Sequence, residues 1–306
     1  MNQLKRRDFI KATTLAGIAF ATRPFYFKKY EPLLSFSTLG CPDWSFGSIL
    51  DFAVANDYNG IELRGIKREL DLLKCPEFSS KENIQSTRKR VEDKKLKIVD
   101  LGSSAEMHHA KGPERDKNMD AAKRFIELAQ QLNCPYIRVF PNIFPKGPER
   151  NEITHNIVTA LQELGNYGKD TGVKVLMETH GELVLSGDIE NIMQSVNHPD
   201  VGLVWDVVNM WSVTKEPPVQ VYTRLKKYIH HTHIKDLVFA NGKEEYVLLG
   251  QGTTPIFEAI DLLAKGGYKG YFSFEWEKLW HPEIAAPEIA LANYPKVMKE
   301  HFKKWS

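Results

Sequence analysis

The chain alternates between short apolar runs and longer segments in which apolar residues recur at helical spacing. Eight apolar or β-branched runs, each bounded by turn residues, have the length and composition of strands buried on both faces. After the third run, Ala122, Phe125, Ile126 and Ala129 mark one face of a helix. Strict alternation of such strands and helices predicts a parallel sheet. The runs lie within residues 33–39, 60–65, 97–102, 135–140, 174–181, 202–209, 229–236 and 270–277.

Eight consecutive units favour a closed (β/α)8 barrel, or TIM barrel, in a single α/β domain over an open doubly wound sheet. No Gly-x-Gly-x-x-Gly follows the first run, which argues against a dinucleotide-binding fold. Residues 103–117, 141–150 and 237–252 have the composition of loops, and Asn241-Gly242 marks a turn in the last of them. The predicted helices cover residues 48–56, 80–95, 118–132, 152–170, 188–196, 218–228, 255–264 and 287–304.

Four of the predicted strands end in a residue that can bind a metal ion. These residues are Glu178, Asp206, His233 and Glu275, and they follow one another at intervals of 28, 27 and 42 residues. Such intervals are about the length of one strand-loop-helix-loop unit. In a closed parallel barrel the carboxyl ends of the strands share one mouth, so we expect the four side chains to converge there.

Taken singly, each of these residues has an ordinary structural explanation. A lone Glu at a strand end pairs with a nearby Lys or Arg, and a lone buried His finds a hydrogen-bond partner in the core. Taken together, three carboxylates at one mouth repel one another unless a cation lies between them. The set therefore predicts one divalent ion. Three oxygen donors and one imidazole favour Mn²⁺ or Mg²⁺, and they also accommodate Zn²⁺, Co²⁺ or Fe²⁺.

Composition and charge narrow the classes of partner. The chain has 306 residues, of which 42% are hydrophobic and 26% charged, and this suits one large domain with a full core. A net charge of +2 gives no basis for expecting nucleic acid as a partner. There is no run of about eighteen apolar residues, so no stable membrane anchor is expected. The three cysteines lack paired spacing and are expected to be free, buried thiols.

The N-terminus has three features of an export signal. Residues 5–11 read Lys-Arg-Arg-Asp-Phe-Ile-Lys, residues 12–20 are modestly apolar, and residues 19–21 have the small-x-small form of a cleavage site. The pattern resembles a twin-arginine signal, which implies passage through the twin-arginine export machinery into the periplasm. The alternative is a basic helix start on a cytosolic protein. We expect residues 1–30 to form the leader and residues 31–306 the barrel domain.

Short motifs around the strand ends carry a resemblance to a known group of barrels. These motifs are residues 178–180 (Glu-Thr-His), 205–209 (Trp-Asp-Val-Val-Asn), 231–236 (His-Thr-His-Ile-Lys-Asp), 250–252 (Gly-Gln-Gly) and 274–275 (Phe-Glu). Over about residues 33–300 the chain resembles the xylose isomerase-like barrel superfamily, which includes sugar phosphate isomerases and epimerases, ketose 3-epimerases, inosose dehydratases and endonuclease IV. The resemblance implies that the four strand-end residues hold one metal ion. It also implies that Glu178 and Glu275 act as a pair of acid and base groups.

Three positions depart from the epimerase pattern. Where the epimerases and endonuclease IV carry a His shortly after the Asp ligand, this chain has Asn209. Where the epimerases carry a second acid and an Arg, it has Val184 and Phe239. Substrate contacts are therefore expected to differ from those of the ketose 3-epimerases. Endonuclease IV needs further His ligands, and the predicted strand at residues 135–140 ends without one, so DNA repair is disfavoured.

Six further residues near the strand ends are candidates for contact with substrate. Arg138 lies in an apolar strand, where a charge needs a partner or a hydrated mouth, so pairing with a carboxylate and contact with substrate are equally supported. For Lys235, contact with substrate and an ion pair at the rim are also equally supported. The six candidates are Glu62, Arg64, Arg138, His180, Asn209 and Lys235.

The sequence therefore predicts an exported, metal-dependent enzyme that acts on a small-molecule sugar, cyclitol or sugar derivative. The expected step is proton abstraction next to a carbonyl through an enediolate, with Glu178 or Glu275 as the base. An isomerase or epimerase is the first expectation. A lyase or dehydratase on an oxidised sugar or cyclitol is the second. The third is a periplasmic carbohydrate-binding protein that keeps the metal without catalysis.

Overall fold

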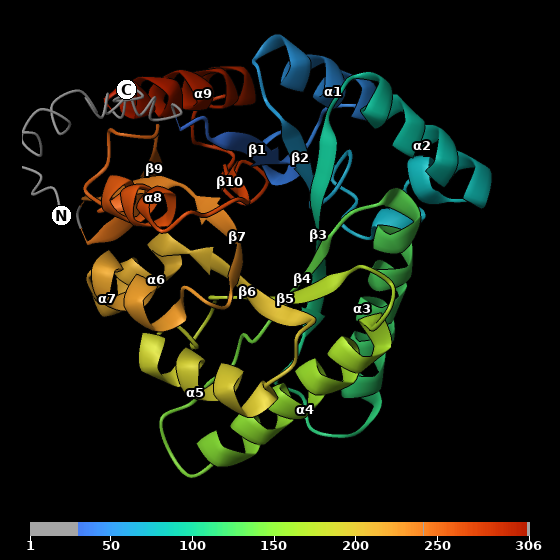
Figure 1. Cartoon of the computed structure of the whole chain (residues 1–306), viewed down its shortest axis with the longest axis vertical. Coiled ribbons are helices and arrows are strands. Elements are labelled where there is room, and N and C mark those ends of the chain that lie inside the picture. The colour runs from blue at the N-terminus through green and yellow to red at the C-terminus, as the bar shows by residue number, and fades with distance from the viewer. Residues whose placement is uncertain (1–29, 241, 305–306) are drawn as a thin grey trace, which may run out of the picture.

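The computed structural model, which describes residues 30–240 and 242–304, shows a closed barrel of parallel strands surrounded by helices (Figure 1). The strand order is β1-β10-β7-β6-β5-β4-β3-β2, and β1 pairs with both β2 and β10, which closes the sheet. The predicted (β/α)8 barrel is confirmed. The barrel strands are β1 (Leu33–Ser37), β2 (Gly60–Leu63), β3 (Lys97–Glu106), β4 (Tyr136–Phe140), β5 (Lys174–Glu178), β6 (Val201–Asp206), β7 (Ile229–Ile234) and β10 (Tyr271–Phe274).

Helices cover the outside of the barrel, as the ring of ribbons in Figure 1 shows. Serine side chains cap the first two: Ser45 accepts a hydrogen bond from the N–H of Ser48 at α1 (Phe46–Ala55), and Ser80 accepts one from the N–H of Asn83 at α2 (Lys81–Asp93). The helices are α1 (Phe46–Ala55), α2 (Lys81–Asp93), α3 (Pro113–Leu132), α4 (Arg150–Gly168), α5 (Ser186–Val196), α6 (Val207–Thr214), α7 (Pro218–Leu225), α8 (Ile256–Lys265) and α9 (Pro287–Lys303). Short 3₁₀ helices lie at Thr38–Gly40, Leu72–Lys74 and Pro76–Phe78.

Two of the three segments expected as loops contain regular structure. In the first, β3 continues to Glu106 and α3 already begins at Pro113. In the last, β8 (Asp236–Ala240) and β9 (Lys243–Val247) form an antiparallel hairpin. Apolar residues on both sides of Asn-Gly are the usual signal for a hairpin, so the sequence did contain this element.

The α6 helix was also not predicted, because it starts without any connecting loop. Asp206 is both the last residue of β6 and the residue that caps α6, where its side chain accepts a hydrogen bond from the N–H of Asn209. One side chain therefore ends a strand, starts a helix and lies at the mouth of the barrel.

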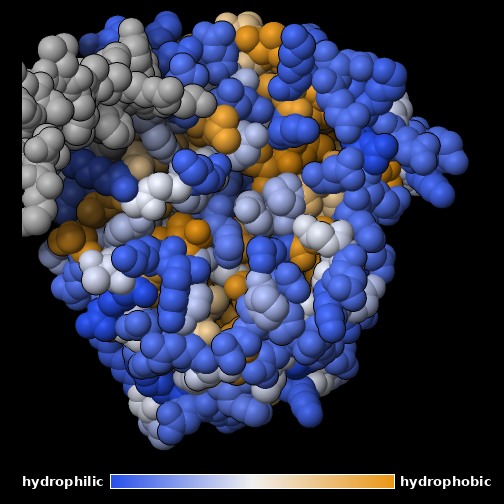
Figure 2. Space-filling model, viewed as in Figure 1, coloured by the Kyte–Doolittle hydropathy of each residue, from blue (hydrophilic) through white to orange (hydrophobic). Residues whose placement is uncertain are grey.

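Apolar side chains fill the space between strands and helices, and the face seen in Figure 2 is mainly hydrophilic. The barrel interior toward the carboxyl ends of the strands differs from this apolar core, because charged and polar side chains are buried there. Burying a charge costs several kcal/mol unless it is paired or binds an ion. This buried polar set comprises Glu62, Asp100, Arg138, Glu178, Asp206, His231, His233, Lys235, Ser273 and Glu275.

Three other predictions concern the rest of the chain. Cys41, Cys75 and Cys134 are buried and free, as predicted. None of the helices in the described residues is both long and apolar enough to span a bilayer. The predicted export leader occupies residues 1–30, of which only Tyr30 lies within the described residues.

Candidate active site

Four neighbouring strands bring the predicted metal-binding side chains together. Glu178 and Asp206 are the last residues of β5 and β6, His233 lies one residue before the end of β7, and Glu275 directly follows β10. Each of them offers one ligand atom, and these atoms all lie within 4.8 Å of one another. All four residues are buried. The convergence that the strand ends predicted is therefore present.

The ring of His233 lies between these carboxylates and a fourth one deeper in the barrel. Its Nδ1 is 3.3 Å from Glu275 Oε1, 3.4 Å from Glu178 Oε1 and 3.9 Å from Asp206 Oδ2. On the other side of the ring, Nε2 lies 3.1 Å from Glu62 Oε2. Nε2 donates to this carboxylate, so a neutral ring presents the lone pair of Nδ1 to the other three. Such an arrangement of acceptors requires a cation.

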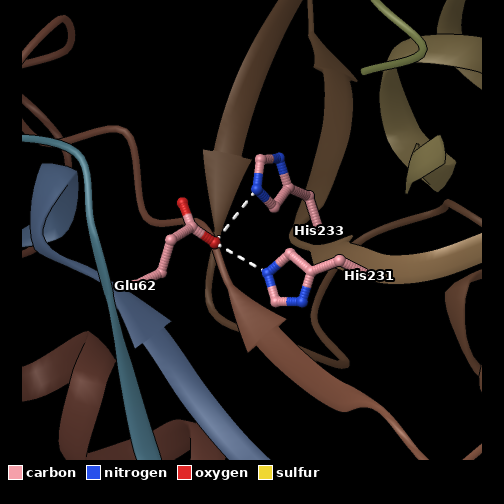
Figure 3. A group of neighbouring side chains, drawn as sticks. All are labelled: Glu62, His231 and His233. Atoms are coloured by element: carbon pink, nitrogen blue, oxygen red, sulfur yellow. Dashed lines mark hydrogen bonds and ion pairs between the residues drawn. The ribbon is translucent and has the colours of Figure 1, made fainter. Parts of the chain in front are cut away.

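Glu62, on β2, orients the ring of His233. Its Oε2 accepts hydrogen bonds from His231 Nε2 at 3.0 Å, from His233 Nε2 and from Ser273 Oγ at 2.9 Å, and Figure 3 shows both histidine rings directed at this one oxygen. The side chain is fully buried and does not line the cavity described below. The structure thus places Glu62 behind His233, away from the cavity, and its contact with substrate stays a prediction. A carboxylate that fixes a metal-binding histidine is a recurrent partner in metal sites.

The donors of the site fit a divalent ion. His233 Nδ1 and Glu178 Oε2 are buried and form no hydrogen bond with any described residue. Burial lowers the pKa of His233, but the carboxylates of Glu275, Glu62 and Glu178 raise it well above its usual value. In the absence of an ion, Nδ1 of His233 therefore attracts a proton, and an ion bound by these four residues would replace that proton. Three oxygen donors and one nitrogen leave open positions around an octahedral ion such as Mn²⁺ or Mg²⁺.

Lys235 supplies a buried positive charge beside this set. Its Nζ lies 2.8 Å from Asp206 Oδ2, 2.8 Å from Glu275 Oε2 and 2.5 Å from Glu277 Oε1. Burial lowers the pKa of Lys235, but the three carboxylates raise it well above its usual value, so the ammonium is charged. Burial also raises the pKa of Asp206 to about 7, although Lys235 acts in the opposite direction. The ammonium partly neutralises the carboxylates that an ion would bind.

Arg138 and Arg64 add two more cations at the same mouth. Arg138 Nε lies 3.3 Å from Glu178 Oε2, and only 1% of the side chain is exposed. Arg64 donates from its Nη2 to Ser104 Oγ at 3.0 Å. Burial and the neighbouring Arg138 lower the pKa of Arg64 to about 9. The geometry shows the first interpretation of Arg138, pairing with a carboxylate. The second, contact with substrate, is also open, because Arg138 lines the cavity described next.

A cavity of about 250 Å³ is lined by two of the four predicted ligands, Glu178 and Glu275. Five of the six predicted substrate contacts line it, and Glu62 is the exception. Sequence reasoning missed Leu39, Phe140 and Glu277 as lining residues, and the position of Glu277, two residues after Glu275, was an available signal. The lining residues are Leu39, Arg64, Arg138, Phe140, Glu178, His180, Asn209, Lys235, Glu275, Glu277 and Trp280.

His180 presents a hydrogen-bond acceptor to this cavity. Asn142 donates from Nδ2 to Glu106 Oε1 at 2.7 Å, so its Oδ1, 2.9 Å from His180 Nδ1, is left to accept. His180 therefore carries its proton on Nδ1, and Nε2 is the acceptor. Burial lowers the pKa of His180, which favours this neutral form. The ring can accept a hydrogen bond from a hydroxyl group.

Asn209 stands where the epimerase pattern has a histidine, and it contacts two predicted ligands. Its backbone N–H donates to Asp206 Oδ1 at 2.8 Å, and its Nδ2 lies 3.4 Å from Glu178 Oε1. An amide at this position can hold both carboxylates in place without adding a further imidazole ligand.

The Gly250-Gln251-Gly252 motif has a structural role next to the site. The backbone N–H groups of Gly250 and Gly252 each donate to Asp236 Oδ2 at 2.9 Å, and Thr254 Oγ1 donates to Asp236 Oδ1. A Cβ atom on Gly252 would lie 1.9 Å from Asp236 Oδ1, so only glycine fits. The motif therefore fixes the buried carboxylate of Asp236, the residue directly after Lys235.

Several known proteins are similar to this chain in sequence or in fold. Inosose isomerase from Halalkalibacterium halodurans is 23% identical over 264 residues, which cover 83% of this chain and 91% of that protein. The 3-dehydroshikimate dehydratase from Bacillus anthracis is 23% identical over 227 residues, which cover 71% of this chain and 78% of that protein. The crystal structure of the IOLI protein with a bound zinc atom aligns with a TM-score of 0.74 at 19% identity, over 89% of this chain and 99% of that one.

The family assignment rests on most of the chain. A model of the family described as xylose isomerase-like TIM barrel matches residues 50–297. This span includes all four convergent ligand residues and every strand of the barrel except β1. The chain belongs to the xylose isomerase-like TIM barrel family.

Proposed function

We propose that the chain is a divalent-metal-dependent isomerase or epimerase of a small sugar, cyclitol or sugar derivative. The observation that carries the proposal is the convergence of four ligand atoms within 4.8 Å of one another, with two of the four residues, Glu178 and Glu275, lining a cavity of about 250 Å³. The similarity to an isomerase and a dehydratase supports this class of reaction. A cavity of this size suits a small polar molecule.

Glu178, Asp206, His233 and Glu275 are the residues that would hold the ion. Mn²⁺ or Mg²⁺ is favoured by the donor set, and Zn²⁺, Co²⁺ or Fe²⁺ also fits it. When bound, the ion supplies Lewis acidity that polarises a carbonyl group of the substrate. Lys235 and Asn209 keep the carboxylates in position around it.

The two glutamates are placed to move a proton. Burial raises the pKa of Glu275, but His233 and Lys235 lower it well below its usual value, so the side chain is ionised as a base must be. Burial also raises the pKa of Glu178, but His233 and Arg138 bring it below its usual value. The two residues come from β5 and β10, with β6 and β7 between them. One carboxylate takes the proton from the carbon next to the carbonyl. The other glutamate, after it has taken up a proton from solvent, returns a proton to the enediolate, and the first then releases its proton to solvent.

A dehydratase is the second candidate, and the cations around the cavity are the specific observation that favours it. Arg64, Arg138 and Lys235 all line the space. Arg138 and Lys235 are paired with carboxylates, but Nη1 of Arg64 has no hydrogen-bond partner among the described residues, and this guanidinium suits a substrate that carries a carboxylate. In an elimination, Glu275 removes the C–H proton, the C–O bond of the neighbouring hydroxyl group breaks, and a proton from Lys235 completes the departing water.

Proton exchange with solvent tests the proposal directly. The protein is loaded with Mn²⁺, and deuterium uptake from D₂O into a panel of keto sugars and keto cyclitols is followed by NMR. We expect uptake with the parent and at least a hundredfold slower uptake with Glu275→Gln, since general base catalysis contributes about 10²–10⁴-fold. Glu283→Gln is the matched control, because it makes the same change on a side chain that is 69% exposed and lines no part of the cavity, and it is expected to keep the exchange.

The outcomes separate the alternatives. Formation of an unsaturated product with loss of water assigns the dehydratase. Uptake that is as fast in metal-loaded Glu275→Gln as in the parent shows that this glutamate is not the base. A parent that binds the metal and the sugars but exchanges no proton across the panel overturns the proposal in favour of a non-catalytic carbohydrate-binding protein.

A further inference from the structure

A second cluster of metal-binding side chains lies where β3 leads into α3, outside the central set. Glu106 is the last residue of β3, and His108 and His109 follow it. Each of the three offers one ligand atom, and these atoms lie within 4.8 Å of one another. Glu106 Oε2 is 3.4 Å from His109 Nε2 and 3.8 Å from His108 Nδ1. The cluster shares no residue with the central site.

The buried ring of His108 gives a second, independent indication that this cluster binds a ligand. The His108 side chain is 7% exposed, and its Nδ1 is buried without a hydrogen-bond partner among the described residues. In the neutral tautomer that carries its proton on Nε2, Nδ1 presents a lone pair. That lone pair faces the carboxylate of Glu106. The two atoms, Nδ1 and Glu106 Oε2, are 3.8 Å apart, which is too far for a direct hydrogen bond and leaves room for an ion between them.

We propose that Glu106, His108 and His109 bind a second divalent transition-metal ion of the zinc type, separate from the central ion. Two imidazoles and one carboxylate are a borderline-soft set that suits Zn²⁺ or Co²⁺ better than Mg²⁺. Ligand bonds of about 2.1 Å in a tetrahedral site put donor atoms about 3.4 Å apart. The separation of Glu106 Oε2 from His109 Nε2 matches this value, and the His108 separation is slightly larger.

The surroundings complete such a site. Asn142 Nδ2 donates to Glu106 Oε1 at 2.7 Å, which holds the carboxylate with Oε2 toward the histidines. Glu106 and His109 both line a cavity of about 580 Å³. A fourth coordination position would therefore face an open, polar space that admits water or an oxygen-bearing ligand. Through Asn142, the same carboxylate is connected to His180 in the central cavity.

Metal stoichiometry tests the second site without any reference to turnover. The full chain is stripped with a chelator and titrated with Zn²⁺ by calorimetry, and the Co²⁺ form is followed by its visible absorption. We expect two equivalents per chain for the parent. We expect one for the double variant His108→Ala/His109→Ala, and also one for Glu178→Gln/Asp206→Asn, which removes central ligands only. His155→Ala, which removes an exposed histidine from α4, is the matched control and is expected to bind two.

Circular dichroism establishes that each variant is folded. Should the double histidine variant not fold, Glu106→Gln takes its place, because it keeps the shape of the side chain and an oxygen acceptor. Loss of one equivalent in either variant with the Co²⁺ spectrum of the central site unchanged supports the proposal. A parent that binds one equivalent, or a folded cluster variant that still binds two, overturns it. In that case the three residues form an ordinary histidine–carboxylate ion pair.

Discussion

Replacing Lys235 by Met tests the electrostatic balance of the central site. The lysine side chain is 1% exposed, and its Nζ contacts Asp206, Glu275 and Glu277 at 2.5–2.8 Å. Met has a similar length and volume, so the substitution removes the charge and leaves little empty space. Removing one partner of a buried ion pair costs about 3–5 kcal/mol, because the other partner stays buried without compensation. We therefore expect the free energy of unfolding in EDTA to fall by about 3–5 kcal/mol.

The same substitution should strengthen metal binding. The ammonium and the ion share Asp206 and Glu275, so loss of the ammonium removes both a competitor and a like charge. We expect Mn²⁺ to bind Lys235→Met at least tenfold more tightly than the parent, which corresponds to about 1.4 kcal/mol. At an equal, saturating Mn²⁺ concentration, the ion should therefore stabilise the variant by about 1.4 kcal/mol more than the parent.

Urea unfolding followed by tryptophan fluorescence, in EDTA and in Mn²⁺, measures both effects, and calorimetry gives the Mn²⁺ affinity. Lys89→Met is the control, because Lys89 pairs with Asp93 on the surface of α2 and its side chain is 72% exposed. The control is expected to change the free energy of unfolding by less than about 0.5 kcal/mol. The reasoning fails if Lys235→Met loses less than about 1 kcal/mol in EDTA, or if it binds Mn²⁺ more weakly than the parent.

Three further predictions follow from other parts of the chain. Burial and the nearby Glu62 raise the pKa of Asp100 to about 7, so the folded state holds this proton more tightly than the unfolded state does. The free energy of unfolding should therefore fall as the pH rises from about 4 to about 7. Asp100→Asn should flatten that fall and unfold at higher urea than the parent at pH 8, and a parallel pH dependence in both proteins would contradict this. Asp236→Ala removes the acceptor of two backbone N–H groups and a hydroxyl group. Urea titrations should show a free energy of unfolding lower by about 3 kcal/mol, and a loss below about 1 kcal/mol would refute the structural role of Asp236. We also propose export to the periplasm: Arg6→Lys/Arg7→Lys should leave precursor in the cytosol on fractionation of the native host, and mature protein in the periplasm of the variant would refute it.

The sequence by itself determined the barrel and the identity of the central residues. Short apolar runs that alternate with amphipathic segments give parallel strands, and eight such units give a closed sheet whose strand ends meet. Glu178, Asp206, His233 and Glu275 end four of those strands, so their convergence follows from connectivity alone. No knowledge of side-chain contacts is needed for that inference.

Only the tertiary structure decided which partners these residues have. Glu62 lies 171 residues from His233 in the sequence, and the two meet because β2 and β7 both direct side chains into the same interior. The pairing of Lys235 with Glu277 and the connection from Glu106 to His180 through Asn142 likewise join different strands and loops. Periodicity tells which side of a strand a residue occupies. It does not tell which residues stand at the same height across the barrel, because the tilt and register of the closed sheet determine that height.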